Sequence, residues 1–269
     1  MKQTPFLRII MAIILGALGM LALLFLPSFW FGLVVTLVIG FALYEFFTML
    51  KLKGIQLFRF FGIVVGVLIP LSIIREFIPT PGWEVFLIIS ALISVFVLQI
   101  FRFDSQNAVI AIATTIFGII YISWLFSFII RLRTVDGYDG RWMAFFVVFV
   151  TKMADAGAYI SGSLFGKHLL IARISPKKTI EGFVGALIFG TLAGISIKGS
   201  LPFGIWQTGL LSIVLTVFGQ IGDFSESLIK RDCQVKDSGN IFPGLGGVMD
   251  IIDSLIFSVP VMYVILKHL

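Results

Sequence analysis

The sequence predicts an all-α protein, a polytopic membrane bundle of about nine transmembrane helices, each of roughly 20 residues. Hydrophobic residues make up 59% of the 269 residues and charged residues only 13%. The mean hydropathy is +1.09. Apolar runs recur along the whole chain, and they are continuous rather than alternating, which argues against a transmembrane β-barrel. A soluble domain is excluded by this composition.

The expected helices are separated by short polar breaks. They cover approximately residues 6–27, 29–50, 57–74, 83–101, 107–130, 142–163, 180–197, 203–224 and 249–267. The first run is longer than a signal-peptide core and ends without a small-residue cleavage pattern, so we expect it to be retained. Without an internal repeat or linker, the chain is expected to be one membrane domain. Residues 1–150 would form a scaffold of about five helices and the start of a sixth, and residues 151–269 would carry the chemistry.

The distribution of basic residues predicts the orientation. With the N-terminus inside, thirteen of the 20 Lys and Arg residues fall in segments on the inner side and six on the outer side. This bias favours an orientation with the N-terminus inside and the C-terminus outside. The net charge of +6 has two explanations, anchoring to anionic lipid or attraction of an anionic substrate.

Carboxylates gather near the predicted inner surface. Asp155 lies about 13 residues into a helix that enters from outside, so it should sit ~20 Å deep. Asp223 ends the eighth run, and Asp250 and Asp253 open the ninth. Asp250 and Asp253 share a helix face at i, i+3, as do Asp223 and Glu226 if their helix extends past residue 224. Two facing acidic surfaces predict a site for a divalent cation, and Asp155 is a candidate either for binding a second cation or for orienting Lys152.

Simpler explanations exist for three of these acids. Lys152 and Asp155, also spaced i, i+3, could neutralise each other inside the bundle. Asp223 and Glu226 could form a solvated helix end that pairs with Lys230. These alternatives stay open at the level of sequence.

Different roles are predicted for Glu45 and for the pair Asp250 and Asp253. Glu45 lies near the inner end of its helix, where a side chain reaches water easily, so no functional role is predicted for it. Asp250 and Asp253 follow Gly246–Gly247 and precede apolar residues, which leaves little water to solvate them. Carboxylate ligands with open positions suit Mg²⁺ and a substrate that brings phosphates. Cys233 is the only cysteine and there are two histidines, so a zinc site is not expected.

Two predicted inner loops carry groups that suit phosphate binding. One contains Ser175, Lys177, Lys178 and Thr179, and Thr179 opens a helix whose N-terminal amides favour an anion. The alternative for these lysines is an ordinary positive-inside flank. The other loop holds Lys230, Arg231, Lys236 and Asp237. Lysine and arginine together can hold a polyphosphate without fixing one geometry.

Glycines fall into two sets. Gly244, Gly246 and Gly247 permit positive φ and exposed amides near a ligand. Gly182, Gly185, Gly190 and Gly194 are spaced along one helix and predict close helix packing in lipid.

These residues together resemble the phosphatidate cytidylyltransferases, also called CDP-diacylglycerol synthases. The resemblance is carried, in order and spacing, by Ser225–Glu226–Ser227–Leu228–Ile229–Lys230–Arg231, Lys236–Asp237, Pro243–Gly244, Gly246–Gly247, Asp250 and Asp253. Residues 152–159 and 175–182 are similar to two further blocks of the family. The resemblance covers about residues 151–257.

The resemblance implies cytidylyl transfer from CTP to phosphatidic acid, giving CDP-diacylglycerol and pyrophosphate at the cytoplasmic face of the membrane. It implies a Mg²⁺-dependent enzyme of phospholipid biosynthesis. The implied roles are catalysis by Asp223, Lys230, Arg231, Asp250 and Asp253, substrate binding by Ser175, Lys177, Lys178, Thr179, Lys236, Asp237, Gly244, Gly246 and Gly247, and metal binding by Asp155, Asp223, Glu226, Asp250 and Asp253.

Two positions depart from the family pattern. Leu245 stands where the family has His, and Ile251 stands where it has Arg. Leucine supplies neither hydrogen bond nor charge, and isoleucine removes a cation that could pair with phosphate. Two explanations stay open: the activity of this chain is impaired, or its acids and remaining lysines suffice.

Two rival functions are weighed against this one. A cation-coupled transporter predicts polar residues near the midplane and symmetry between halves, whereas eight of the 14 acids lie within residues 151–254. Another lipid enzyme, a CDP-alcohol phosphotransferase, would need an Asp-Gly-x-x-Ala-Arg segment that the sequence lacks. The expected partners are CTP, phosphatidic acid and membrane lipid, with no nucleic acid, and small-residue helix faces leave a homodimer open.

Overall fold

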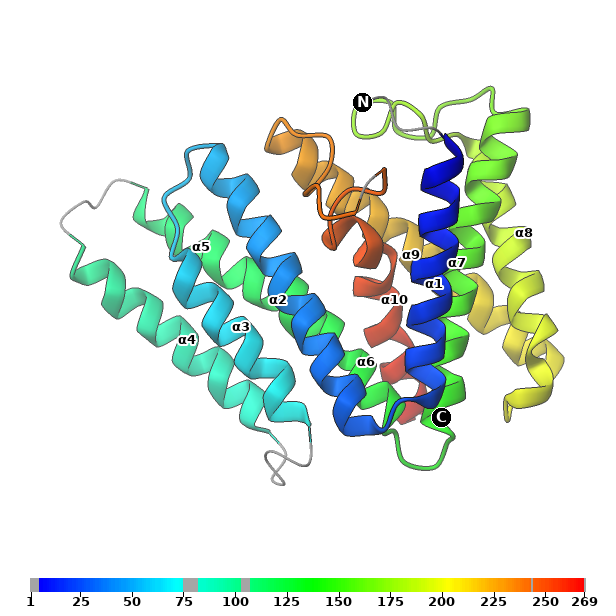
Figure 1. Cartoon of the computed structure of the whole chain (residues 1–269), viewed down its shortest axis with the longest axis horizontal. Coiled ribbons are helices and arrows are strands. Elements are labelled where there is room, and N and C mark those ends of the chain that lie inside the picture. The colour runs from blue at the N-terminus through cyan, green and yellow to red at the C-terminus, as the bar shows by residue number, and fades with distance from the viewer. Residues whose placement is uncertain (1–4, 75–81, 103–106, 243, 269) are drawn as a thin grey trace. The chain divides into compact units, whose positions relative to one another are not determined.

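The computed structural model describes residues 5–74, 82–102, 107–242 and 244–268. Every element named in this part of the chain is a helix, which confirms the all-α class (Figure 1). The elements are α1 (Pro5–Phe25), α2 (Ser28–Leu52), α3 (Arg59–Ile73), α4 (Trp83–Ile100), α5 (Ala108–Gly118), η1 (Ile119–Trp124), α6 (Leu125–Arg133), α7 (Gly140–Phe165), α8 (Ile180–Ser196), η2 (Lys198–Ser200), α9 (Ile205–Asp232) and α10 (Met249–His268).

The predicted number of membrane spans is not confirmed. Within the described residues, six helices are long and apolar enough to cross a membrane: Ser28–Leu52, Trp83–Ile100, Ala108–Arg133, Gly140–Phe165, Ile205–Asp232 and Met249–His268. Three further apolar helices, Ile14–Phe25, Arg59–Ile73 and Ile180–Ser196, are shorter. Each of the nine predicted runs therefore contains a helix. Two of these helices, Arg59–Ile73 with 15 residues and Ile180–Ser196 with 17, are shorter than an ordinary span of about 20 residues.

The chain divides into two compact units. The first comprises residues 1–15, 26–131 and 232–251, and the second residues 16–25, 132–231 and 252–269. The boundary passes through α10, between Ile251 and Ile252. The division into a scaffold over residues 1–150 and a catalytic part over residues 151–269 concerns function, and it stays a prediction.

In the first unit, α3 lies between α2 and α4 (Figure 1). Two glycines of α3 let its neighbours approach closely, since a Cβ at Gly62 would meet Phe47 at 2.6 Å and one at Gly66 would meet Leu43 at 2.3 Å. Val65, Ile69, Ala91 and Ile119 form a buried apolar cluster in this unit. In lipid the hydrophobic effect does not drive helices together, so van der Waals contacts between packed side chains such as these stabilise the bundle.

In the second unit, α7 and α8 lie side by side (Figure 1). A Cβ at Gly185 would meet Ser161 Oγ at 2.1 Å, and one at Gly194 would meet Ser212 Oγ at 1.9 Å. Gly190 is crowded in the same way by Thr216 of α9. The prediction that the glycines of this helix permit close packing is confirmed, and the packing fixes α7, α8 and α9 as the frame of the acidic cluster described below.

Candidate active site

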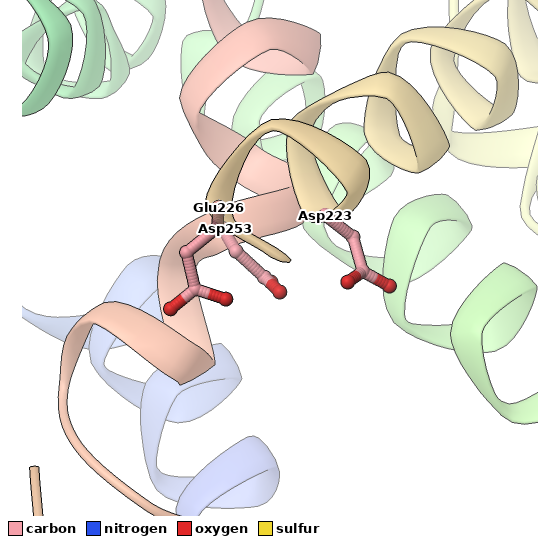
Figure 2. Close-up of side chains that lie close together, drawn as sticks. All are labelled: Asp223, Glu226 and Asp253. Atoms are coloured by element: carbon pink, nitrogen blue, oxygen red, sulfur yellow. The ribbon is translucent and has the colours of Figure 1, made fainter. Parts of the chain in front are cut away.

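Three carboxylates meet in the second unit. Asp223 and Glu226 come from α9 and Asp253 comes from α10, and their ligand oxygens lie within 4.8 Å of one another. Figure 2 shows the three side chains where α9 passes over the first turns of α10. Glu226 is fully buried and Asp253 is 8% exposed. The condition set by the sequence, that the eighth helix continue past residue 224, is met because α9 extends to Asp232.

A glycine explains why the acids come so close. A Cβ at Gly222 would lie 2.4 Å from the backbone oxygen of Asp253, and one at Gly219 would lie 3.4 Å from that of Ser254. Only a hydrogen atom fits at position 222, so the backbones of α9 and α10 touch there. The residue after Gly222 is Asp223, and this contact therefore places its carboxylate beside that of Asp253.

Gly222→Ala is expected to disrupt the acidic cluster, because the obstructing atom belongs to the backbone of α10 and cannot swing aside. We expect a loss of stability of about 1–3 kcal/mol together with weaker binding of Mn²⁺. Gly209→Ala on the same helix is the matched control, since no atom lies within 4 Å of a Cβ there. Thermal unfolding in detergent and Mn²⁺ titration measure both effects, and equal behaviour of the two variants would contradict the packing argument.

Lysines accompany two of the three acids. Lys178 Nζ lies 2.5 Å from Asp223 Oδ2, and it also lies 4.0 Å from the ring centroid of Phe224. Lys230 Nζ donates to Glu226 Oε2 at 2.5 Å. The sequence left open a solvated helix end in which Lys230 pairs with the acids of α9. The pairing with Glu226 is confirmed, but the solvation is wrong, because the Glu226 side chain is fully buried. A buried charge needs such a partner.

Asp155 of α7 takes part in a separate network. Its carboxylate accepts from Gln220 Nε2 at 3.2 Å and from Ser254 Oγ at 3.1 Å. Lys152 Nζ lies 3.4 Å from Asp155 and donates to Ser254 Oγ at 2.9 Å. These contacts favour the explanation in which Asp155 neutralises and orients Lys152. A role of Asp155 as a metal ligand stays a prediction.

The loop between α7 and α8 is shaped by local hydrogen bonds. Thr179 Oγ1 accepts from Gly182 N at 3.1 Å and so caps α8, as the sequence predicts. Lys178 N donates to Ser175 O at 3.3 Å, and Arg231 Nε of α9 donates to Ile174 O at 3.3 Å. Lys177 is exposed. The loop thus directs Lys178 toward Asp223 and leaves Lys177 in contact with solvent.

The first unit holds the glycine-rich segment and Asp250. Gly244 and Gly246 have φ of 81° and 99°, which confirms that these positions need glycine. Asp250 Oδ2 accepts from Ser238 N at 2.9 Å, Ser238 Oγ at 2.7 Å and Gly247 N at 2.7 Å. Asp250 and Asp253 both lie in the first turns of α10, yet the carboxylate of Asp250 is bonded to this segment. Lys236 and Asp237, which precede Ser238, are exposed.

Glu45 is the residue whose role sequence reasoning missed. The prediction that it reaches water is wrong, because the residue is only 3% exposed. Its carboxylate accepts from Val248 N at 3.0 Å and Met249 N at 2.9 Å, and Ser238 Oγ, whose single hydrogen is shared with Asp250, lies 3.1 Å away. About 200 positions of sequence separate Glu45 from these partners, so local spacing carried no signal for the contact.

The environment of Cys233 does not favour a reactive thiol. The thiol is buried, and burial raises its pKa, which disfavours the reactive thiolate.

The fold and the site define an integral membrane protein in which carboxylates and lysines are held among apolar helices. Such groups are costly in this setting and mark functional sites. The donor set consists of carboxylate oxygens, which suits a hard divalent cation.

Comparison with known proteins gives the family. The model of the cytidylyltransferase family matches residues 6–269, and the chain belongs to this family. It is 34% identical over 261 residues to the phosphatidate cytidylyltransferase of Bacillus subtilis (strain 168), covering 94% of each chain. It is 33% identical over 296 aligned positions to that of Synechocystis sp. (strain ATCC 27184 / PCC 6803 / Kazusa), covering 96% of this chain and 95% of the relative.

A third relative, the phosphatidate cytidylyltransferase of Staphylococcus saprophyticus, is 34% identical over 251 residues, with 91% of this chain and 94% of the relative covered. These findings confirm the predicted family and the predicted class of nucleotidyltransferase. They do not favour a transporter.

Proposed function

We propose that this chain transfers the cytidylyl group of CTP to phosphatidic acid and releases pyrophosphate. A phosphate oxygen of phosphatidic acid forms a new bond to the α-phosphorus of CTP, and the bond from that phosphorus to the β-phosphate oxygen breaks. The observation that carries the proposal is the cluster of Asp223, Glu226 and Asp253, flanked by Lys178 and Lys230, in a chain of this family.

The three clustered acids are the proposed ligands of Mg²⁺. Carboxylate oxygens close together, with no competing nitrogen or sulfur ligand in the group, match what this ion prefers. When bound, Mg²⁺ would supply positive charge that offsets the charge of two anionic substrates. Asp155 and Asp250 remain proposed ligands on the strength of the resemblance, with a second cation as the accompanying proposal.

Positioning and charge neutralisation are the proposed source of the acceleration. The attacking phosphate oxygen of phosphatidic acid is anionic near neutral pH, so no strong general base is needed. Lys178 and Lys230 form ion pairs with Asp223 and Glu226. Their ammonium groups would also attract the phosphates of a substrate. Arg231, Lys177, Ser175 and Thr179 are proposed to bind phosphate from the neighbouring loop.

The segment from Lys236 to Gly247 is assigned to substrate binding by the resemblance. Lys236 and Asp237 are exposed and can reach a soluble ligand. Gly244 is exposed and lets a ligand approach the backbone closely. The amides of Gly246 and Gly247 are bonded to Phe242 O and Asp250 Oδ2, so their proposed role in substrate binding rests on the resemblance.

The proposed location is the cytoplasmic membrane of a bacterium with the N-terminus inside, supported by the charge bias and the bacterial relatives. A homodimer through small-residue helix faces is a separate proposal, tested by sedimentation in detergent.

The direct test is product analysis. Purified protein in detergent micelles with phosphatidic acid, CTP and Mg²⁺ should form CDP-diacylglycerol and equimolar pyrophosphate, both measured by mass spectrometry. ATP in place of CTP, and chelation of the metal, should each abolish the product. Formation of neither product under conditions where a relative is active would contradict the proposal.

A further inference from the structure

Glu45 connects a distant helix to the start of α10. We infer that Glu45 is a positioning residue: it anchors the first turn of α10 and thereby fixes the acids that the proposed function assigns to the metal. The effect on metal binding rests on the proposed function, whereas the hydrogen bonds of Glu45 are observed independently of it. It assigns a role to α2, in the part of the chain where the resemblance identified no functional residue.

Glu45 accepts hydrogen bonds from the backbone at the start of α10. The N-terminal amides of a helix lack partners within it, and a local Ser, Thr, Asp or Asn usually supplies one. Val248 precedes α10 and cannot do so. Instead, Glu45 Oε1 accepts from Val248 N at 3.0 Å and Oε2 accepts from Met249 N at 2.9 Å. A negative charge at this end is also favoured by the helix dipole.

Two glycines form the space that the carboxylate occupies. A Cβ at Gly239 would lie 2.5 Å from Glu45 Oε1, and a Cβ at Gly247 would lie 2.3 Å from Oε2. Any larger residue at these positions would displace the Glu45 side chain. The glycine-rich segment is therefore fitted around Glu45.

Ser238 links Glu45 to Asp250. The Ser238 hydroxyl lies 3.1 Å from Glu45 Oε2 and 2.7 Å from Asp250 Oδ2. Asp250 also accepts from Ser238 N and Gly247 N. The two carboxylates and Ser238 thus form one network, buried at Glu45 and Ser238, that joins α2, the 238–247 segment and the first turn of α10. We call these three residues the α10 clamp.

The clamp acts on the metal site through α10 itself. Asp253 lies one turn after Asp250 on the same helix, and its carboxylate is in the cluster with Asp223 and Glu226. A shift or fraying of the first turn would move Asp253 relative to α9. Residues that orient metal ligands typically change metal affinity or activity by about 10–100-fold when replaced.

Glu45→Gln tests this inference. It keeps the size of the side chain but removes its charge and replaces one of the two oxygens that accept from Val248 N and Met249 N. Glu84→Gln is the matched control. Glu84 is a buried carboxylate of α4 in the same unit, 8% exposed, and it pairs with Arg131. Three quantities are measured in detergent: hydrogen exchange of residues 238–256, affinity for Mn²⁺ without substrate, and kcat with the KM for CTP.

Glu45→Gln should speed hydrogen exchange in residues 238–256 and weaken Mn²⁺ binding by about 10–100-fold, with the loss of activity in kcat rather than KM. Glu84→Gln should leave all three unchanged even where it lowers the thermal midpoint. Ser238→Ala, a milder change, should shift the same quantities by less, and Glu45→Asp, which keeps the charge, should restore part of the affinity.

Unchanged Mn²⁺ affinity in Glu45→Gln and Ser238→Ala would overturn the positioning role, as would a loss equal to that in Glu84→Gln. Absence of Mn²⁺ binding by the unchanged protein would overturn it as well. The outcome for the proposed function is separate. A protein that binds Mn²⁺ through a clamp-dependent site but forms no CDP-diacylglycerol would refute the proposed reaction and leave the positioning role standing.

Discussion

Asp253→Asn is expected to lower the rate of CDP-diacylglycerol formation by about a thousandfold or more, which corresponds to roughly 4 kcal/mol of transition-state stabilisation. Asparagine has the same shape as aspartate but lacks its charge. The substitution therefore leaves Asp223 and Glu226 without the carboxylate that α10 contributes to the group. Steady-state rates of pyrophosphate release over a range of Mg²⁺ concentrations measure the effect.

Asp232→Asn is the matched control for this prediction. Asp232 ends α9, the helix that carries Asp223 and Glu226, and pairs with Lys53 at 2.5 Å, but its side chain is 64% exposed. An exposed pair of this kind contributes little to stability, so the control should retain its rate. The thermal midpoint of Asp253→Asn should not fall, because removing one of three clustered negative charges relieves repulsion. Full activity in Asp253→Asn would refute the ligand role of this residue.

The paired substitution Leu245→His and Ile251→Arg is expected to raise kcat/KM for CTP by about tenfold or more, since one preorganised donor can contribute 10²–10³. Both changes return the residue of the family pattern, and the arginine adds a cation that can pair with phosphate. Leu245 and Ile251 are each partly exposed, so polar side chains can be placed there without burying an unpaired charge.

The polar but uncharged pair Leu245→Asn and Ile251→Gln separates charge from polarity. It should leave kcat/KM near that of the unchanged chain, while the His and Arg pair raises it. Each single substitution should give part of the gain. If the His and Arg pair produces no increase in the rate of CDP-diacylglycerol formation, these two positions do not limit catalysis, and the acids and lysines present suffice.

Much of the helical architecture follows from hydropathy. The last run, expected over residues 249–267, is observed as Met249–His268, because polar glycine-rich residues precede it and apolar residues continue to its end. The acids of α9 were placed by their i, i+3 spacing and by the extension of the helix to Asp232. Local periodicity was enough for these features.

Features that depend on residues far apart in the sequence were not predictable in this way. The fifth run, expected over 107–130 as one helix, is observed as α5, η1 and α6, with a π-helical stretch at Ile119–Trp124. Glu45 was assigned to the water-facing end of its helix by position alone, whereas Gly239 and Gly247 enclose it. Asp250 and Asp253 share a turn, yet the carboxylate of Asp250 bonds to Ser238, which the spacing could not indicate.

The central claim is that the acids of α9 and α10 jointly hold a divalent cation. Anomalous scattering from crystals grown with Mn²⁺ tests it most directly. The account predicts a peak within roughly 2.5 Å of carboxylate oxygens of both Asp223 and Asp253, close to the metal–oxygen distances of such ions. A peak bound elsewhere, or none at a Mn²⁺ concentration that supports turnover, would contradict it.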